Sequence, residues 1–110
     1  MLNKRVFCKF HKSCYFSDEI KKKGREKARI RSGKADLMSY VVTLAENPGE
    51  QLDIMRSIFL KSRRFKSSPP VICGIARSYT GATDIVLMIA EDAARAGMPG
   101  RLRDYLESIR

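Results

Sequence analysis

The sequence predicts a mixed fold of helices and strands, α/β or α+β, with a small β-α-β-α body and a short C-terminal helix. Between residues 38 and 110, two short β-branched runs alternate with segments whose apolar residues recur at helical spacing. Charge divides the chain near the same place, because residues 1–37 hold 12 Lys/Arg and 4 Asp/Glu, whereas residues 67–110 hold 5 of each. We therefore expect a compact α/β domain at 38–110 after a basic N-terminal extension at 1–37.

The basic extension contains two weaker structural patterns. Residues 5–10 alternate in the manner of a strand that adds to the sheet of the body. Residues 18–31 allow a helix capped by Ser17, but only three of them are apolar and Gly24 weakens the middle. We expect this helix to be solvated, or partly disordered, and not to be a core element.

The body opens with a strand and a helix. Residues 40–45 are β-branched and aromatic and are followed by Asn47-Pro-Gly, which predicts a strand. A helix is expected at 48–65, because Asn47 is a good N-cap, a first-turn proline is tolerated and Glu50 stands at the third helical position. Apolar residues at helical spacing give this segment one stripe, which includes Leu52, Met55, Ile58 and Phe59.

A second strand is predicted at 71–76, where a near-continuous apolar run is typical of a strand covered on both faces. A helical crossover from 40–45 would make these two strands parallel, with a right-handed connection. The next helix is expected at 81–96, with Thr80 as its cap and with Gly97 and Pro99 closing it.

The helix at 81–96 also predicts self-association. Residues 85–90 are all apolar and point in every direction around the helix, so the helix has to be covered more than once. Two strands alone make a poor sheet, and a second copy of the chain would relieve that problem. We therefore expect a homodimer, with a short helix at 101–109 packed on the body.

Composition excludes several classes of protein. Three cysteines cannot all pair, which favours a reducing, cytoplasmic location over a disulfide scaffold. The longest apolar run, residues 85–90, is too short to span a membrane, so no membrane partner is expected. His11 is the only histidine, and Cys73 lies in an apolar strand, where burial raises the pKa of a thiol. We therefore expect no catalytic residues and no cofactor.

The basic extension is a candidate contact surface for DNA or RNA. Its cations would neutralise phosphates, with Phe7, Phe10, Tyr15 and Phe16 nearby to stack on bases. The candidate residues are Lys21, Lys22, Lys23, Arg25, Lys27, Arg29, Arg31 and Lys34. No zinc-finger, RNP or GXXG signature is present, so the charge indicates nonspecific contact only. The alternative is a protein-interaction or structural subunit in which the extension only adds solubility.

The turn between the strand at 71–76 and the helix at 81–96 is a candidate anion site. Arg77, Ser78 and Thr80 would add donors to the exposed N–H groups of the helix start. The glycine spacings of nucleotide-binding loops are missing. We favour the simpler interpretation that Gly74 allows close packing, Thr80 caps the helix and Arg77 is solvated.

The segment Cys8-Lys-Phe-His11-Lys-Ser-Cys14 is a candidate zinc site together with Cys73. Three cysteines and one histidine form a sound tetrahedral ligand set. However, Cys8 and His11 fall on opposite faces of a strand, and a second closely spaced cysteine pair is missing. We favour a core cysteine with an exposed histidine and an exposed cysteine.

Overall fold

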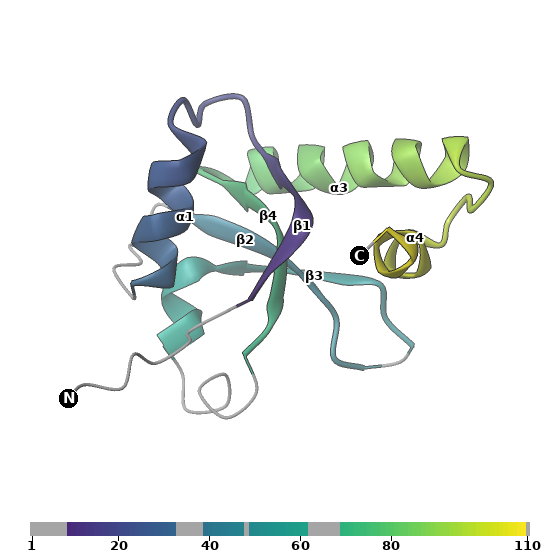
Figure 1. The fold of residues 1–110 in the computed structure, drawn as a ribbon, viewed down its shortest axis with the longest axis horizontal. Coiled ribbons are helices and arrows are strands. Elements are labelled where there is room, and N and C mark those ends of the chain that lie inside the picture. The colour runs from purple at the N-terminus through teal and green to yellow at the C-terminus, as the bar shows by residue number, and fades with distance from the viewer. Residues whose placement is uncertain (1–8, 33–38, 48, 62–68, 110) are drawn as a thin grey trace.

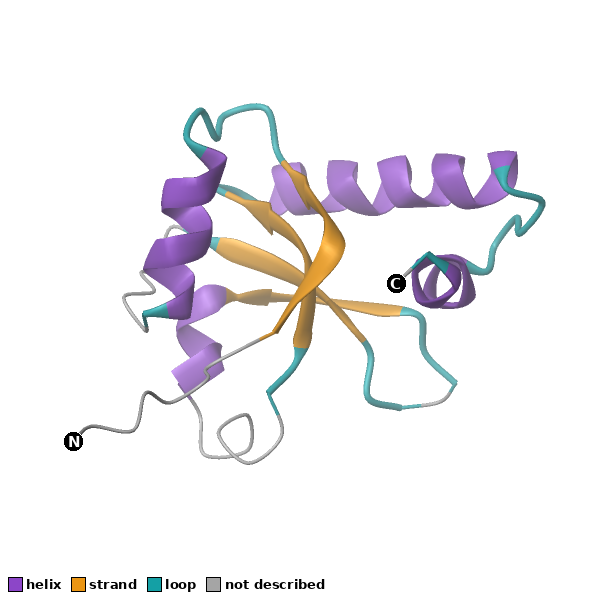
Figure 2. Ribbon diagram, in the orientation of Figure 1, coloured by secondary structure: helices purple, strands orange, loops and turns teal. Residues whose placement is uncertain are grey.

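In the computed structural model, which describes residues 9–32, 39–47, 49–61 and 69–109, a four-stranded sheet lies between two helical layers (Figures 1 and 2). The strands are β1 Lys9–Phe16, β2 Tyr40–Leu44, β3 Leu52–Arg56 and β4 Val71–Ala76. The helices are α1 Lys23–Arg31, α3 Tyr79–Arg95, α4 Leu102–Ser108 and the 3₁₀ helix η1 Ser57–Lys61. The mixed class of helices and strands and the C-terminal helix are confirmed.

The sheet has the strand order β1-β4-β2-β3 and is mixed. β1 is parallel to β4, whereas β2 is antiparallel to both β4 and β3. The expected parallel pairing of the strands at 40–45 and 71–76 is therefore wrong. The chain between them contains β3, which runs antiparallel to β2, and β4 begins at the edge of the sheet where β2 ends, so β4 is antiparallel to β2 as well.

The helix expected at 48–65 is wrong. Asn47 does not cap a helix: its Nδ2 donates to Glu50 Oε1 at 3.2 Å, and the two residues lie in a hairpin turn between β2 and β3. In β3, Leu52 and Ile54 pack toward α3 while Met55 packs on the opposite face of the sheet. The apolar spacing in a run this short fits both the helical and the strand period, and pairing with β2 selects the strand. Residues 62–65 lie outside the described residues.

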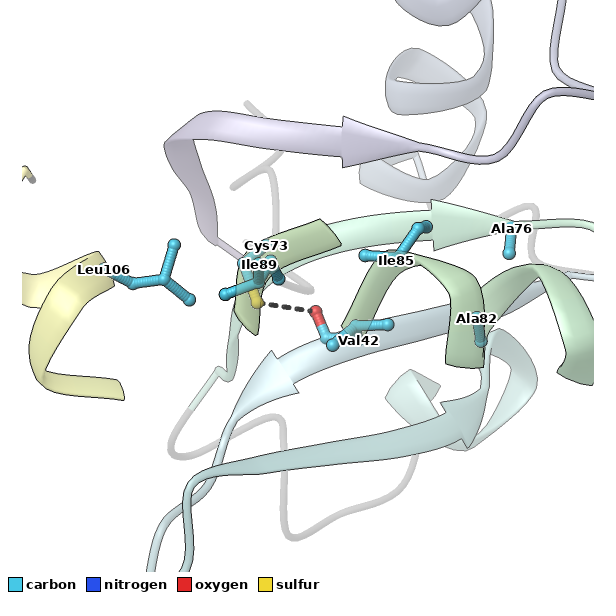
Figure 3. Packing of buried hydrophobic residues seen from close by; sticks show 7 residues of the cluster. All are labelled: Val42, Cys73, Ala76, Ala82, Ile85, Ile89 and Leu106. Carbon is cyan, nitrogen blue, oxygen red and sulfur yellow. Dashed lines mark hydrogen bonds between the residues drawn. The ribbon is translucent and has the colours of Figure 1, made fainter. Parts of the chain in front are cut away.

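The core consists of two clusters, one on each face of the sheet. The α1-side cluster contains Ile20, Ile30, Val41, Leu60, Ile72 and Ile75. The α3-side cluster contains Val42, Cys73, Ala76, Ala82, Ile85, Ile89 and Leu106 (Figure 3). α1 is largely solvated, as expected, but Ile30 is only 1% exposed, so the expectation that this segment adds nothing to the core is wrong.

The N-terminal strand begins later than expected and contains a large bulge. β1 covers Lys9–Phe16, and the remainder of the predicted strand at 5–10 lies outside the described residues. Phe10 pairs with Ile72 and Tyr15 with Gly74, so β1 inserts extra residues between two points that are close on β4. His11 lies within this irregular stretch and is buried.

Local sequence signals mark both ends of α3, but the residue that caps its N-terminus differs from the predicted one. Ser78 is the N-cap, and its Oγ accepts from the Gly81 N–H at 3.0 Å, so the prediction that Thr80 caps the helix is wrong. Gly97 has a φ of 81° and follows the end of α3, which confirms its role in closing the helix. The chain then continues into α4.

The proposed boundary near Met38 falls in residues 33–38, outside the described part of the chain. On the two sides of this gap, β1 hydrogen bonds to β4 and Ile30 packs with Val41. Residues 9–32 therefore share one sheet and one core with the segments that follow. A separately folding domain at 38–110 stays a prediction.

We predict that Gly74→Ala destabilises the protein by about 1 to 3 kcal/mol. A Cβ at this position would lie 2.7 Å from Ile85 Cγ2 and 3.2 Å from Val42 Cβ, so β4 and α3 could not keep their distance. Urea unfolding followed by circular dichroism measures the change. Gly24→Ala is the control, since nothing lies within 4 Å and alanine favours the helix. Equal stability of Gly74→Ala and wild type would contradict the close approach.

Candidate nucleic-acid interface

The segment 17–22, α1 and the end of β4 surround an open pocket of about 450 Å³. This basic pocket is lined by Glu19, Ile20, Lys21, Lys22, Arg25, Glu26, Arg29 and Arg77. Five cations stand against two carboxylates, a formal excess of three positive charges. The fold thus brings four of the predicted nucleic-acid residues together with Arg77 of the predicted anion site.

Two arginines converge at the pocket on one hydroxyl. Arg29 Nη2 lies 3.0 Å and Arg77 Nη1 lies 3.1 Å from Ser39 Oγ, the side chain of a buried residue. Both guanidinium groups also approach Glu26 Oε2, at 3.3 and 3.7 Å. The Arg29 and Arg77 side chains keep 29% and 34% exposure, although Arg29 Nε is itself buried. Arg77 is therefore held in an ion-pair network, and the interpretation that it is simply solvated is wrong.

A carboxylate of the chain itself occupies the start of α3. Glu19 Oε1 accepts from the Arg77 N–H and from Ser78 Oγ, each at 3.3 Å. Hydrogen bonds from its own backbone N–H and from this turn lower the pKa of Glu19, so it is anionic at neutral pH. Ser78 thus serves Glu19 and the helix cap, and Thr80 is exposed outside the pocket lining.

The other face of α1 has a structural use for its cations. Lys27 Nζ and the Arg31 guanidinium lie 5.2 and 5.0 Å from the ring centre of Phe10, and Lys23 Nζ lies 5.6 Å from that of Phe16. These rings also pack against the α1-side cluster. Cation-π contacts of this kind contribute roughly 0.5 to 1 kcal/mol at exposed sites. Lys34 lies outside the described residues.

The aromatic residues of β1 are engaged within the fold. Phe10 and Phe16 lie beneath the cations of α1. The Tyr15 hydroxyl donates a hydrogen bond to Asp92 of α3, and burial and this carboxylate raise the pKa of Tyr15. Phe7 lies outside the described residues. Base stacking on these described rings would require displacing contacts that the fold already makes.

The zinc candidate is divided by the structure. The expectation that His11 is exposed is wrong, because its exposed fraction is 2%. Its Nε2 lies 2.7 Å from the Leu106 carbonyl, and its Nδ1 accepts from the Ser13 N–H at 2.9 Å. This pattern fits the neutral tautomer with the proton on Nε2 and engages both ring nitrogens. Cys14 is half-buried against the α1-side cluster, whereas Cys73 belongs to the α3-side cluster. Cys8 lies outside the described residues, among which no three potential ligands gather.

Sequence reasoning missed the pocket residues Glu19 and Glu26, and Ser39, which contacts the two pocket arginines. Glu26 stands three residues before Arg29, a helical ion-pair spacing, so that contact was detectable from sequence. Ser39 and Glu19 carry no such signal, because each meets Arg77 only through the tertiary fold.

Comparison of the chain with known protein families, characterised proteins and solved structures finds no match. Among the described helices, none combines the length and the apolar character needed to cross a bilayer.

We predict that Cys73 resists alkylation in the native protein. It is fully buried, its Sγ lies 3.3 Å from the Val42 carbonyl (Figure 3), and burial raises its pKa to about 12, so little thiolate exists at pH 8. Modification by N-ethylmaleimide, located by peptide mass spectrometry, should be at least about a hundredfold slower than in urea. Half-buried Cys14 is the internal comparison. Equally rapid modification of Cys73 with and without urea would contradict the burial.

Proposed function

We propose that the protein is a non-catalytic binding module that contacts DNA or RNA nonspecifically through the basic pocket and the adjoining cations of segment 17–22 and α1. The observation that supports this proposal is the convergence of Lys21, Lys22, Arg25, Arg29 and Arg77 on one pocket. A formal excess of three positive charges in one concave surface attracts a polyanion. It also focuses the electrostatic field toward solvent.

The contacts are proposed to be with phosphates and not with bases. Phe10 and Phe16 already lie under the cations of α1, which leaves the pocket with charged donors as its main binding groups. Donors to phosphate position a protein on a strand but carry no sequence information directly. We therefore propose binding with little preference among sequences.

Two buried groups support a non-catalytic role. Both ring nitrogens of His11 hydrogen bond to backbone groups, and burial keeps the Cys73 thiol protonated at neutral pH. Neither residue is therefore well suited to act as a general base or as a thiolate nucleophile.

The number of cysteines bears on the location of the protein. Three cysteines cannot all pair in disulfides, which suits a reducing compartment, so we propose a cytoplasmic location.

We predict that the protein binds fluorescent single-stranded DNA or RNA with a steep salt dependence, measured by anisotropy. The double variant Lys22→Gln/Arg25→Gln should weaken binding and reduce the slope of log K against log salt by about two.

A matched control removes the same charge from a distant surface. Arg95 and Arg101 are exposed near the C-terminal end of α3 and the start of α4, at the opposite end of the molecule from α1 (Figure 1). Arg95→Gln/Arg101→Gln should keep the salt slope of the wild type. Equal losses in both double variants would remove the pocket from the proposed role.

A second proposal is a protein-interaction or structural subunit that associates with itself. The observation that favours it is the exposure of large apolar side chains, with Leu87 of α3 62% exposed and Phe59 56% exposed. The sheet of the single chain covers only one side of α3, through Ile85 and Ile89. Leu87 is thus available to a second copy.

We predict a dimeric mass by light scattering at high micromolar concentration, and a monomeric mass for Leu87→Glu, because a charge at this position cannot be buried without a partner. Ala28→Glu is the control, since it adds the same charge at an exposed position of α1. A wild-type monomer at this concentration would overturn the self-association proposal and leave the nucleic-acid proposal intact.

A further inference from the structure

We propose that the basic pocket selects a phosphate monoester, the terminal phosphate of a nucleic-acid strand, and that Glu26 is the internal counter-ion which this phosphate displaces. The inference rests on the proposed function, because it names the part of the nucleic acid that enters the pocket. It is carried by the arrangement of Arg29, Arg77, Ser39 and Glu26.

The two arginines form a convergent pair of donors. Arg29 Nη2 and Arg77 Nη1 both lie within hydrogen-bond distance of Ser39 Oγ, at 3.0 and 3.1 Å, so these two pocket-lining residues are close to one another. One guanidinium comes from α1 and the other from the turn between β4 and α3. Two planar forks that meet at one point suit an anion with several oxygens, since each fork can bind two of them.

A terminal phosphate fits this arrangement better than a phosphate within a strand. A phosphodiester carries one negative charge and two free oxygens, and the nucleosides on both sides would have to enter the pocket with it. A phosphate monoester carries about −1.5 to −2 at pH 7 and offers three free oxygens. It enters end first, and its charge better matches the formal excess of three cations in the pocket lining.

Glu26 acts as the counter-ion while the pocket is empty of ligand. Its Oε2 lies 3.3 Å from Arg29 Nη2 and 3.7 Å from Arg77 Nη1, so one carboxylate serves two guanidinium groups at the long end of the ion-pair range. Like-charged arginines this close repel one another, and Glu26 reduces that repulsion. A phosphate with more oxygens and more charge replaces this contact, so Glu26 competes with the ligand.

The cations around the pocket favour a strand end over a small free phosphate. Lys21, Lys22 and Arg25 are exposed and lie on the segment 17–22 and the first turn of α1. They are placed to meet the phosphates that follow the terminal one along a strand. A free phosphate would use only the arginine pair, whereas a strand uses both groups.

The test compares two oligonucleotides of one sequence, one with a 5′-phosphate and one with a 5′-hydroxyl, by competition against a fluorescent strand. We expect wild-type protein to bind the phosphorylated strand at least about tenfold more tightly. Inorganic phosphate is the third probe, followed by NMR signals of the arginine Nε–H groups. A tenfold preference together with displacement of the fluorescent strand supports the strand end as the ligand.

Three variants separate selection of the end from general attraction. Arg77→Lys keeps the charge but removes the fork, so the preference should fall to near one while the salt slope is unchanged. Glu26→Gln should increase the preference, because the internal competitor is neutral. Lys22→Gln should weaken both strands equally and leave the preference unchanged. Thermal melting of each variant verifies its fold, and the wild-type comparison needs no variant.

The outcomes distinguish this inference from the function on which it rests. Equal, salt-dependent binding of both strands by wild type would overturn the terminal-phosphate site and leave nonspecific nucleic-acid binding standing. Binding of neither strand, with arginine signals that respond to inorganic phosphate, would overturn the nucleic-acid function and retain a phosphate monoester site for a small molecule. No response to any of the three probes would overturn both.

Discussion

The parallel pairing of β1 with β4 is the interaction on which the rest of the structure depends. Its ladder is extended by hydrogen bonds from the Lys9 N–H to the Pro70 carbonyl and from the Ser17 N–H to the Ile75 carbonyl, both at 3.0 Å. Because the strands are parallel, the chain leaves β1 at the same edge where β4 ends. That geometry places Glu19 beside the turn of Arg77, and α1 follows directly.

β1 also contacts the opposite layer, which contains α3 and α4. His11, inside the bulge, hydrogen bonds to the Leu106 carbonyl of α4, and Tyr15 after it donates to Asp92 of α3. Side chains alternate along a strand, so the odd-numbered His11 and Tyr15 face this layer while the even-numbered Phe10 and Phe16 pack on the other. β1 therefore contacts both helical layers, and the register shift between Phe10 and Tyr15 interrupts its pairing with β4.

Sequence reasoning located β2, β4, α3 and α4 because their apolar runs and flanking turn residues agreed with one another. It failed at 48–65, where Asn47 and Glu50 fit both a helix cap and a hairpin turn, and only the neighbouring strand could decide. The same limit applied to the site. Cationic residues were visible from composition, but the meeting of Arg29 with Arg77 is a contact between residues far apart in the chain, mediated by Ser39.

The two faces of α1 show why the number of cations alone does not identify a function. Lys23, Lys27 and Arg31 cover the rings of β1, where their charge stabilises the fold through contacts that need no ligand. Arg25 and Arg29 face the pocket, where the nearby carboxylates offset only part of the charge. This difference in position, within one helix, is the reason that we locate the proposed anion contact at the pocket and not on the ring-facing side of α1.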